Sequence, residues 1–216
     1  MNRLPLILLL LLLLSLPGFT LAGEWQWDFD TAQLDEWEQI GTGEWHQVEL
    51  PARGGILELR KSGKPPTKPV RKPANILLAP SPALAAFTIE LEAKTLKPEI
   101  KGADIAVIFG YQDSDHFYYA HICNDVNPVH QVIMKVEGAK KTRKTIHLEE
   151  KPVAALKDDW QRVRITRSAE GRVEVFVDDM ENPSLTAEAT EWLSGRIGLG
   201  SFNDTAQFDS VKLVEK

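Results

Sequence analysis

Residues 160–177 read WQRVRITRSAEGRVEVFV, two runs of alternating apolar and polar side chains on either side of a short turn. Such alternation is typical of β-strands that bury one face. A three-residue turn, Ala169-Glu170-Gly171, with glycine in the left-handed position is a favoured connection between antiparallel strands. A turn of two residues would mix the two faces, so we expect the three-residue turn. In this register one face carries the apolar side chains Val163, Ile165, Val175 and Val177.

The same period of two extends through most of the chain, and no long amphipathic helix is visible. Residues 25–29 (WQWDF) and 87–91 (FTIEL) alternate in the same way. Short strands at regular spacing, with turns between them, indicate two packed sheets. We therefore predict an all-β protein that folds as a two-sheet antiparallel sandwich.

A second hairpin is predicted to turn about Ser114. This register pairs Phe109 with Tyr119 and Val107 with His121, so that these side chains share one face. The strand that follows has two alternating sets. The uniformly apolar set, which we expect to face the core, is Val132, Met134 and Val136. Gln131 and Lys135 then face outward, beside Tyr119 and His121.

The first 22 residues have the three parts of a secretory signal peptide. Arg3 precedes an almost unbroken leucine run, and Thr20-Leu21-Ala22 suits cleavage before Gly23. The leucine run is well short of the about 20 residues that a membrane-spanning helix requires, so an uncleaved anchor is the weaker alternative. We predict an exported protein, periplasmic or extracellular, with a single domain at 23–216 and no membrane span after cleavage.

The chain carries 25 basic and 31 acidic residues, a net charge of −6 at pH 7. A mildly acidic protein is poorly suited to nucleic acid as its main partner. The single cysteine, Cys123, cannot form an internal disulfide, and its apolar surroundings in the sequence predict a buried side chain.

Residues 60–75 break both the alternation and the acidic balance. This stretch interleaves six cations with four prolines: Arg60, Lys61, Lys64, Pro65, Pro66, Lys68, Pro69, Arg71, Lys72 and Pro73. One interpretation is a solvated connection that proline stiffens. The other is a rim that attracts an anionic ligand.

Further motifs mark turns and core positions along the chain. They are Phe29-Asp30, Gly43-x-Trp45, Gly55-x-Leu57, Phe109-Gly110-Tyr111-Gln112-Asp113, Gly195-x-Ile197-Gly198-Leu199 and Phe208-Asp209-x-Val211-x-Leu213. With the 160–177 hairpin, they resemble bacterial secreted proteins of the concanavalin A-like lectin/glucanase superfamily, in particular the LamG-like branch that includes the 3-keto-disaccharide hydrolase domain. The resemblance covers nearly the whole predicted mature chain, and it implies a jelly roll of two antiparallel sheets.

Relatives in that superfamily often bind glycans on the concave sheet, and some cleave them. Its glucanases carry carboxylates spaced as Glu-x-Asp-x-x-Glu, a run that this chain lacks. Glycoside hydrolysis commonly requires two carboxyl groups that flank one bond. No pair in this sequence takes that role from its spacing.

Aromatic rings stack on sugars, and polar side chains bind their hydroxyl groups. Tyr119, His121, Gln131 and Lys135 supply this mixture and form a candidate ligand face; alternatively, Tyr119 and His121 are structural. In the loop that follows residue 123, Asp125 and His130 are a candidate acid–base couple and a further part of this site. Alternatively, they are turn residues with local hydrogen bonds.

The resemblance also implies a structural calcium ion between the first and last strands. Asp209 matches the last-strand position, and Asp28 or Asp30 is the first-strand candidate. Carboxylate oxygens suit calcium, and secreted modules use weak calcium sites. Alternatively, these residues point outward from edge strands.

Taken together, the residues and the resemblance favour a secreted module that binds carbohydrate on its concave sheet. The first alternative is a glycoside-active enzyme like the 3-keto-disaccharide hydrolases, using His121 or His130 with a nearby acid. The second is a non-catalytic structural or protein-interaction domain of the cell envelope.

Overall fold

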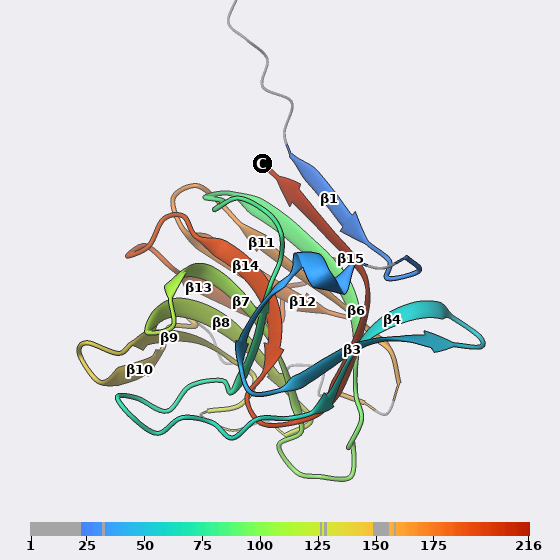
Figure 1. The fold of residues 1–216 in the computed structure, drawn as a ribbon. Helices are drawn as coiled ribbons and strands as arrows, with labels where there is room; N and C mark the ends of the chain where they lie inside the picture. Colours follow the sequence, from blue (N-terminus) through green and yellow to red (C-terminus); the bar gives the residue numbers. More distant parts are fainter. Residues whose placement is uncertain (1–22, 32, 126, 128, 149–155, 158) are drawn as a thin grey trace, which may run out of the picture.

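The computed structural model describes residues 23–31, 33–125, 127, 129–148, 156–157 and 159–216. Two antiparallel β-sheets lie face to face (Figure 1), and the described residues include no α-helix, only a short 3₁₀ turn, η1, at Leu34–Glu36. The predicted all-β, two-sheet antiparallel jelly-roll sandwich is confirmed. The predicted signal peptide lies outside the described residues. No described helix is long and apolar enough to cross a membrane.

Sheet A has the strand order β13-β12-β11-β6-β15-β4-β3, and β1 pairs with β15 beside this row. Its strands are β1 (Glu24–Trp27), β3 (Glu44–Leu50), β4 (Gly54–Lys61), β6 (Phe87–Thr95), β11 (Gln161–Arg167), β12 (Arg172–Val177), β13 (Leu185–Glu188) and β15 (Ala206–Glu215). The first and last strands of the described chain are therefore neighbours, as Figure 1 shows.

Sheet B has the strand order β10-β9-β8-β7-β14-β5-β2. Its strands are β2 (Glu38–Gly41), β5 (Asn75–Leu78), β7 (Asp104–Asp113), β8 (His116–Cys123), β9 (Val132–Glu137), β10 (Thr142–Thr145) and β14 (Arg196–Ser201). Neighbours that are distant in sequence, such as β7 and β14, bring segments from the middle and the end of the chain together.

The main hydrophobic core lies between the two sheets. On sheet A the alternation is regular, and every second residue of β6 is buried. The hairpin predicted at 160–177 is confirmed: Val163 pairs with Val177, and Ile165 pairs with Val175. Gly171 has a φ of 97°, the left-handed conformation that the predicted turn requires.

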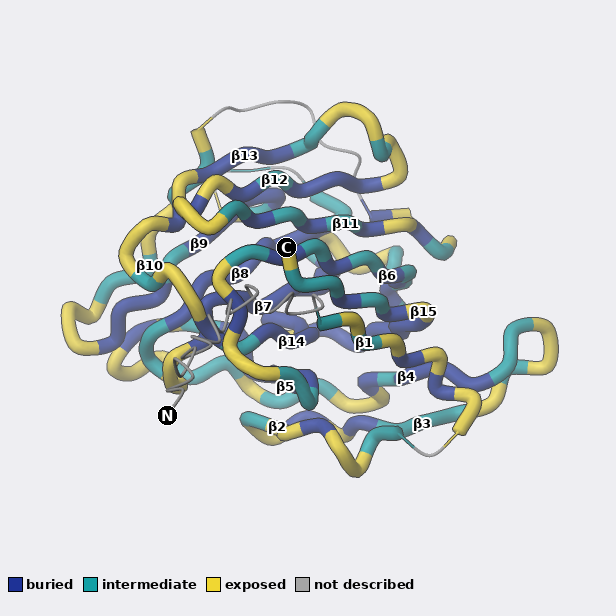
Figure 2. The backbone as a smooth tube through the Cα atoms, turned by 90° about the horizontal axis from the view of Figure 1, so that it is seen from above, coloured by how far each residue is buried: buried dark blue, intermediate teal, exposed yellow. Residues whose placement is uncertain are grey.

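Sheet B is apolar on both faces, unlike sheet A. In β8 every residue from Phe117 to Cys123 is buried, and this strand is dark blue over most of its length in Figure 2. Side chains that point toward sheet A join the main core. Those that point away form a second cluster on the outer face of sheet B: Ile76, Leu78, Ala106, Ile108, Tyr111, Phe117, Tyr119, Val132, Met134 and Val136. Val70 and Phe202, from segments outside the strands, join this cluster.

The predicted register of β7 against β8 is wrong by one residue. The observed pairs are Phe109–Tyr118, Ile108–Tyr119 and Ala106–His121. An irregularity between Phe109 and the turn, where Gly110 has a φ of 57°, shifts the pairing. Tyr119 and His121 therefore lie on the outer face, whereas Phe109 points into the main core.

The predicted faces of β9 are reversed. Ile133 points into the main core, whereas Met134 pairs with Tyr119 on the outer face. Lys135 is opposite Tyr118, so it does not lie beside Tyr119 as predicted. The physical reason is that both faces of the sheet are apolar, so the alternation does not tell which face is inside.

The connection at residues 62–74, here called the proline-rich segment, covers part of the outer face of sheet B. Val70 is buried in the second cluster. Asn75, at the start of β5, accepts a hydrogen bond from the backbone N–H of Gly63 at 2.7 Å, and Lys72 forms an ion pair at the β7–β8 turn. These contacts fix the segment at both ends.

Arg167, the last residue of β11, is only 2% exposed and has no ion-pair partner among the described residues. Its guanidinium group donates to four backbone carbonyl oxygens, those of Ala85, Ala189, Trp192 and Leu193. It therefore joins the end of β11 to two connections that are far apart in the sequence.

We expect Arg167→Lys to lower the free energy of unfolding by about 2–4 kcal/mol, because an ammonium group cannot bind all four carbonyls and leaves buried acceptors unpaired. Chemical denaturation measures the change. Arg162→Lys, at an exposed position of the same strand, is the control. Equal losses in the two variants would contradict a special role for Arg167.

Candidate functional site

A small hollow, here called the polar pocket, opens at one end of the outer face of sheet B and has a volume of about 200 Å³. Four segments of sheet B meet here: the start of β7, the end of β8, β10 and the segment after β14. The start of β7 lies beside the end of β8 because the two strands are antiparallel. The proline-rich segment closes one side. The pocket is lined by Arg71, Gly102, Asp104, His121, Val129, His130, Arg143, Phe202 and Asn203.

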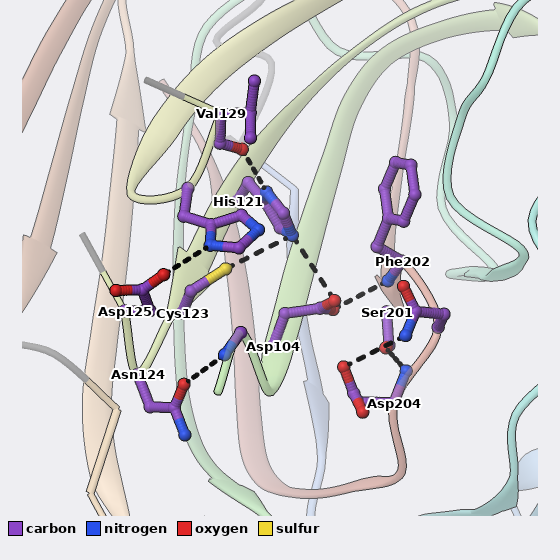
Figure 3. A network of polar contacts seen from close by, with 12 residues as sticks. Asp104, His121, Cys123, Asn124, Asp125, Val129, Ser201, Phe202 and Asp204 are labelled. Carbon is purple, nitrogen blue, oxygen red and sulfur yellow. Dashed lines mark hydrogen bonds and ion pairs between the residues drawn. The ribbon is translucent and has the colours of Figure 1, made fainter. Parts of the chain in front are cut away.

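His121 and Asp104 form a buried pair at this site (Figure 3). His121 Nδ1 lies 2.9 Å from the carbonyl oxygen of Val129, and its Nε2 lies 3.4 Å from Oδ2 of Asp104. Because a carbonyl oxygen only accepts hydrogen bonds, Nδ1 carries a proton and Nε2 is left to face the carboxyl group. The other oxygen of Asp104 accepts a hydrogen bond from the backbone N–H of Phe202 at 2.7 Å. Backbone groups thus fix the orientation of both side chains.

Asp204 is a second buried carboxyl group next to the polar pocket (Figure 3). Its backbone N–H donates to Oγ of Ser201 at 2.7 Å. Burial, and then the charge of Asp104, raise the pKa of Asp204 to about 6. The side chain is therefore largely protonated in mild acid and ionised at neutral pH.

Two arginines lie over the ring of Phe202. The guanidinium carbons of Arg71 and Arg143 are each 5.0 Å from the ring centroid, so they are at most 10 Å apart. Arg71 belongs to the proline-rich segment. Arg143 belongs to β10, where its pairing with Val136 places it on the outer face of sheet B. Neither guanidinium group has an ion-pair partner within the described part of the chain.

The structure brings Asp125 and His130 together at the edge of the pocket. His130 Nδ1 is 3.4 Å from Oδ2 of Asp125, and Nδ2 of Asn127 lies within hydrogen-bond distance of both atoms. The ring of His130 also contacts the ring of His121, edge to face, at 5.4 Å between centroids. Burial, and then the charge of His121, lower the pKa of His130, so its ring is neutral at pH 7.

The other predicted ligand residues have different surroundings. Tyr119 is fully buried with its ring centroid 5.8 Å from that of His121, and burial raises the pKa of its hydroxyl group. Gln131 is buried and donates to the carbonyl oxygen of Cys123 at 2.5 Å. Lys135 pairs with carboxylates on the opposite side of sheet B. Cys123 is buried, as predicted, and burial raises the pKa of its thiol.

The residues predicted to hold calcium do not form a ligand set. Nε of Arg53 lies 2.5 Å from Oδ2 of Asp209. Oδ1 of Asp30 accepts the backbone N–H of Gly55 at 2.7 Å, and Oδ1 of Asp28 accepts that of Asp30 at 3.1 Å. Among the described residues, no group of three or more His, Cys, Asp or Glu side chains could hold a metal ion. Calcium binding stays a prediction, and these contacts of Asp209, Asp30 and Asp28 do not favour it.

Two of the residues predicted from the sequence, His121 and His130, line the polar pocket. Arg71 lies in the basic stretch for which an anionic rim was one interpretation. The sequence pattern did not predict a role for Asp104, Arg143, Phe202, Asn203 or Asp204. For Asp104 and Asp204 the one visible signal is a carboxyl group close to an apolar strand, which equally describes an ordinary turn; Arg143, Phe202 and Asn203 have no such signal.

No family model and no curated protein match the chain. Solved structures do match it. The carbohydrate-binding module CBM66 from Bacillus subtilis has a TM-score of 0.56 and 18% identity, over 82% of this chain and 94% of that chain. Domain 4 of AbnA, a GH43 extracellular arabinanase from Geobacillus stearothermophilus, in complex with arabinotriose, has a TM-score of 0.54 and 12% identity, over 90% and 93%. At these identities the matches show a shared fold.

A third match is the exoplasmic/lumenal domain of VIP36 in its Ca²⁺/Man3GlcNAc-bound form. It has a TM-score of 0.52 and 13% identity, over 85% of both chains. The fold is thus found in carbohydrate-binding modules, glycosidase domains and a sugar-bound lumenal domain. The LamG-like branch stays a prediction.

We expect Asp204→Asn to stabilise the protein by about 1–2 kcal/mol near pH 7.5 and to change little near pH 4. The folded pKa of about 6 lies above the unfolded value of 3.8, so the protonated carboxyl favours folding below about pH 4. This contribution is lost as the pH rises through about 6, whereas asparagine has no proton to lose.

Thermal melts of both proteins at the two pH values measure this difference. Asp35→Asn, at an exposed position outside the pocket, controls for the general effect of removing a negative charge. An equal shift at both pH values would mean that Asp204 does not titrate differently in the folded protein.

For calcium, we expect the melting temperature to be the same with EDTA and with added calcium chloride, because Arg53 already binds Asp209. An ion bound only by the folded state would raise the melting temperature. A fall on chelation that calcium reverses, and that Asp209→Asn abolishes, would restore the predicted site.

Proposed function

We propose that this protein is an exported module that binds carbohydrate in the polar pocket of sheet B. The observation that carries the proposal is a hollow in which arginine, histidine and amide groups from separate segments converge. Sugar hydroxyl groups need such fixed donors and acceptors. The fold supports it, since CBM66 is a carbohydrate-binding module and AbnA domain 4 is in complex with arabinotriose.

A second hollow extends the polar pocket. It has a volume of about 450 Å³ and shares Arg71 and Asn203 with the pocket. The polar pocket alone is smaller than the about 300–1,000 Å³ of ordinary ligand sites. Together the two hollows fall within that range, so we propose that the ligand is an oligosaccharide that occupies both.

A glycoside-active enzyme is the second candidate, and one observation favours it. Each histidine of the site lies 3.4 Å from a carboxyl oxygen, His121 from Asp104 and His130 from Asp125. Such pairs are suited to proton transfer. If the protein cleaves a glycan that it binds, His121→Asn will abolish turnover while binding survives, and the non-catalytic proposal then fails.

To test the binding proposal, the purified protein is applied to a broad glycan array, with and without calcium. We expect Asn203→Trp to weaken binding at least about tenfold, because this exposed residue lines both hollows and a larger side chain fills them. Asn182→Trp, at an exposed loop position between β12 and β13, is the matched control and keeps full affinity.

Retained binding by Asn203→Trp would place the glycan elsewhere on the surface. A blank array with a folded sample would instead favour the structural or protein-interaction domain of the envelope.

A further inference from the structure

The cations around the two hollows differ from most other cations of this protein. In the proline-rich segment and its flanks, Arg60, Lys61 and Lys72 each have a carboxylate partner. Lys64 and Arg71 line the hollows and, among the described residues, have no such partner. Arg143, which also contacts the ring of Phe202, likewise has no carboxylate partner among the described residues. Other cations, such as Lys68 and Lys144, also lack such a partner within the described part of the chain, but Lys64, Arg71 and Arg143 are the ones that line the two hollows.

This local charge is notable because the whole chain has a net charge of −6. A cation that lines a hollow and lacks a carboxylate partner is available to bind an anion from outside. The carboxyl group of Asp104 does not neutralise this rim, since it is only 1% exposed and its oxygens face His121 and the backbone N–H of Phe202.

We infer that the ligand is an acidic oligosaccharide, whose carboxylate or sulfate group is bound by Arg71 and Arg143 above Phe202 while the next sugar residues lie along Lys64. This inference rests on the proposed carbohydrate function and adds the ligand class. Two guanidinium groups at most 10 Å apart allow one sugar residue to contact both. Guanidinium groups form strong, paired hydrogen bonds with carboxylates and sulfates.

The test is calorimetric titration of the full protein with matched pairs of oligosaccharides. One arm uses galacturonate, glucuronate and mannuronate oligosaccharides and their carboxyl-reduced counterparts. The other arm uses sulfated galactan oligosaccharides and their desulfated counterparts. The two arms distinguish the two sources of negative charge.

We expect at least one acidic member to bind about tenfold or more tightly than its neutral counterpart, with an affinity that falls as salt rises. Arg71→Gln and Arg143→Gln should each weaken binding of that member about tenfold, and by a larger factor than they weaken any binding of its neutral counterpart. Lys144→Gln is the matched control, because Lys144 follows Arg143 on β10, is exposed, and points to the opposite side.

Equal binding of acidic and neutral counterparts, or equal losses in the Lys144 control, would overturn the inference but leave the proposed function standing. Binding of neutral glycans alone would likewise overturn the acidic-ligand inference and leave the proposed carbohydrate function standing. If neither acidic nor neutral glycans bind the folded protein, the proposed carbohydrate function itself fails.

Discussion

Sheet B is apolar on both faces, and the rest of the structure depends on this constraint. One face packs against sheet A, so the other must be covered to keep side chains such as Tyr119 and Met134 from water. The proline-rich segment provides that cover through Val70, and its prolines reduce the entropy lost when the segment is fixed. Because the cover is incomplete at one end of the sheet, a hollow remains there with the ends of several strands around it.

This same constraint decides how much of the fold the sequence predicts. On sheet A, polar residues mark the outer face, and the hairpin at 160–177 was predicted with the correct pairing of Val163 and Val177. On sheet B, a shift of one residue moves apolar side chains from one buried face to the other. The alternation of apolar residues therefore does not distinguish the correct register from the shifted one. The irregularity near Gly110 produced such a shift between β7 and β8. The face of Lys135 was wrong for a separate reason, because the apolar set that includes Met134 lies on the outer face.

Residues of the site were predictable from the sequence only where a single segment contains the polar side chains. His121 and His130 were identified because a polar ring stands out in or beside an apolar strand. Asp104 comes from a different part of the chain and depends on pairing between β7 and β8 to meet His121. Arg71 has a sequence signal in its basic, proline-rich surroundings, but only the folded segment shows that it lies over Phe202.

The placement of Asp104 and Asp204 is consistent with the binding proposal and does not match the arrangement of a two-carboxylate glycosidase. Asp104 and Asp204 are close enough for the charge of one to raise the pKa of the other, and both are buried. Glycosidases that use two carboxyl groups hold them about 5 Å or more apart on either side of the bond. Here Asp104 and Asp204 lie together beneath the hollow, whereas the guanidinium groups of Arg71 and Arg143, which have no carboxylate partner among the described residues, line it. In the proposed complex, such a separation of charge would orient an anionic group toward the rim and leave a structural role to Asp104 and Asp204.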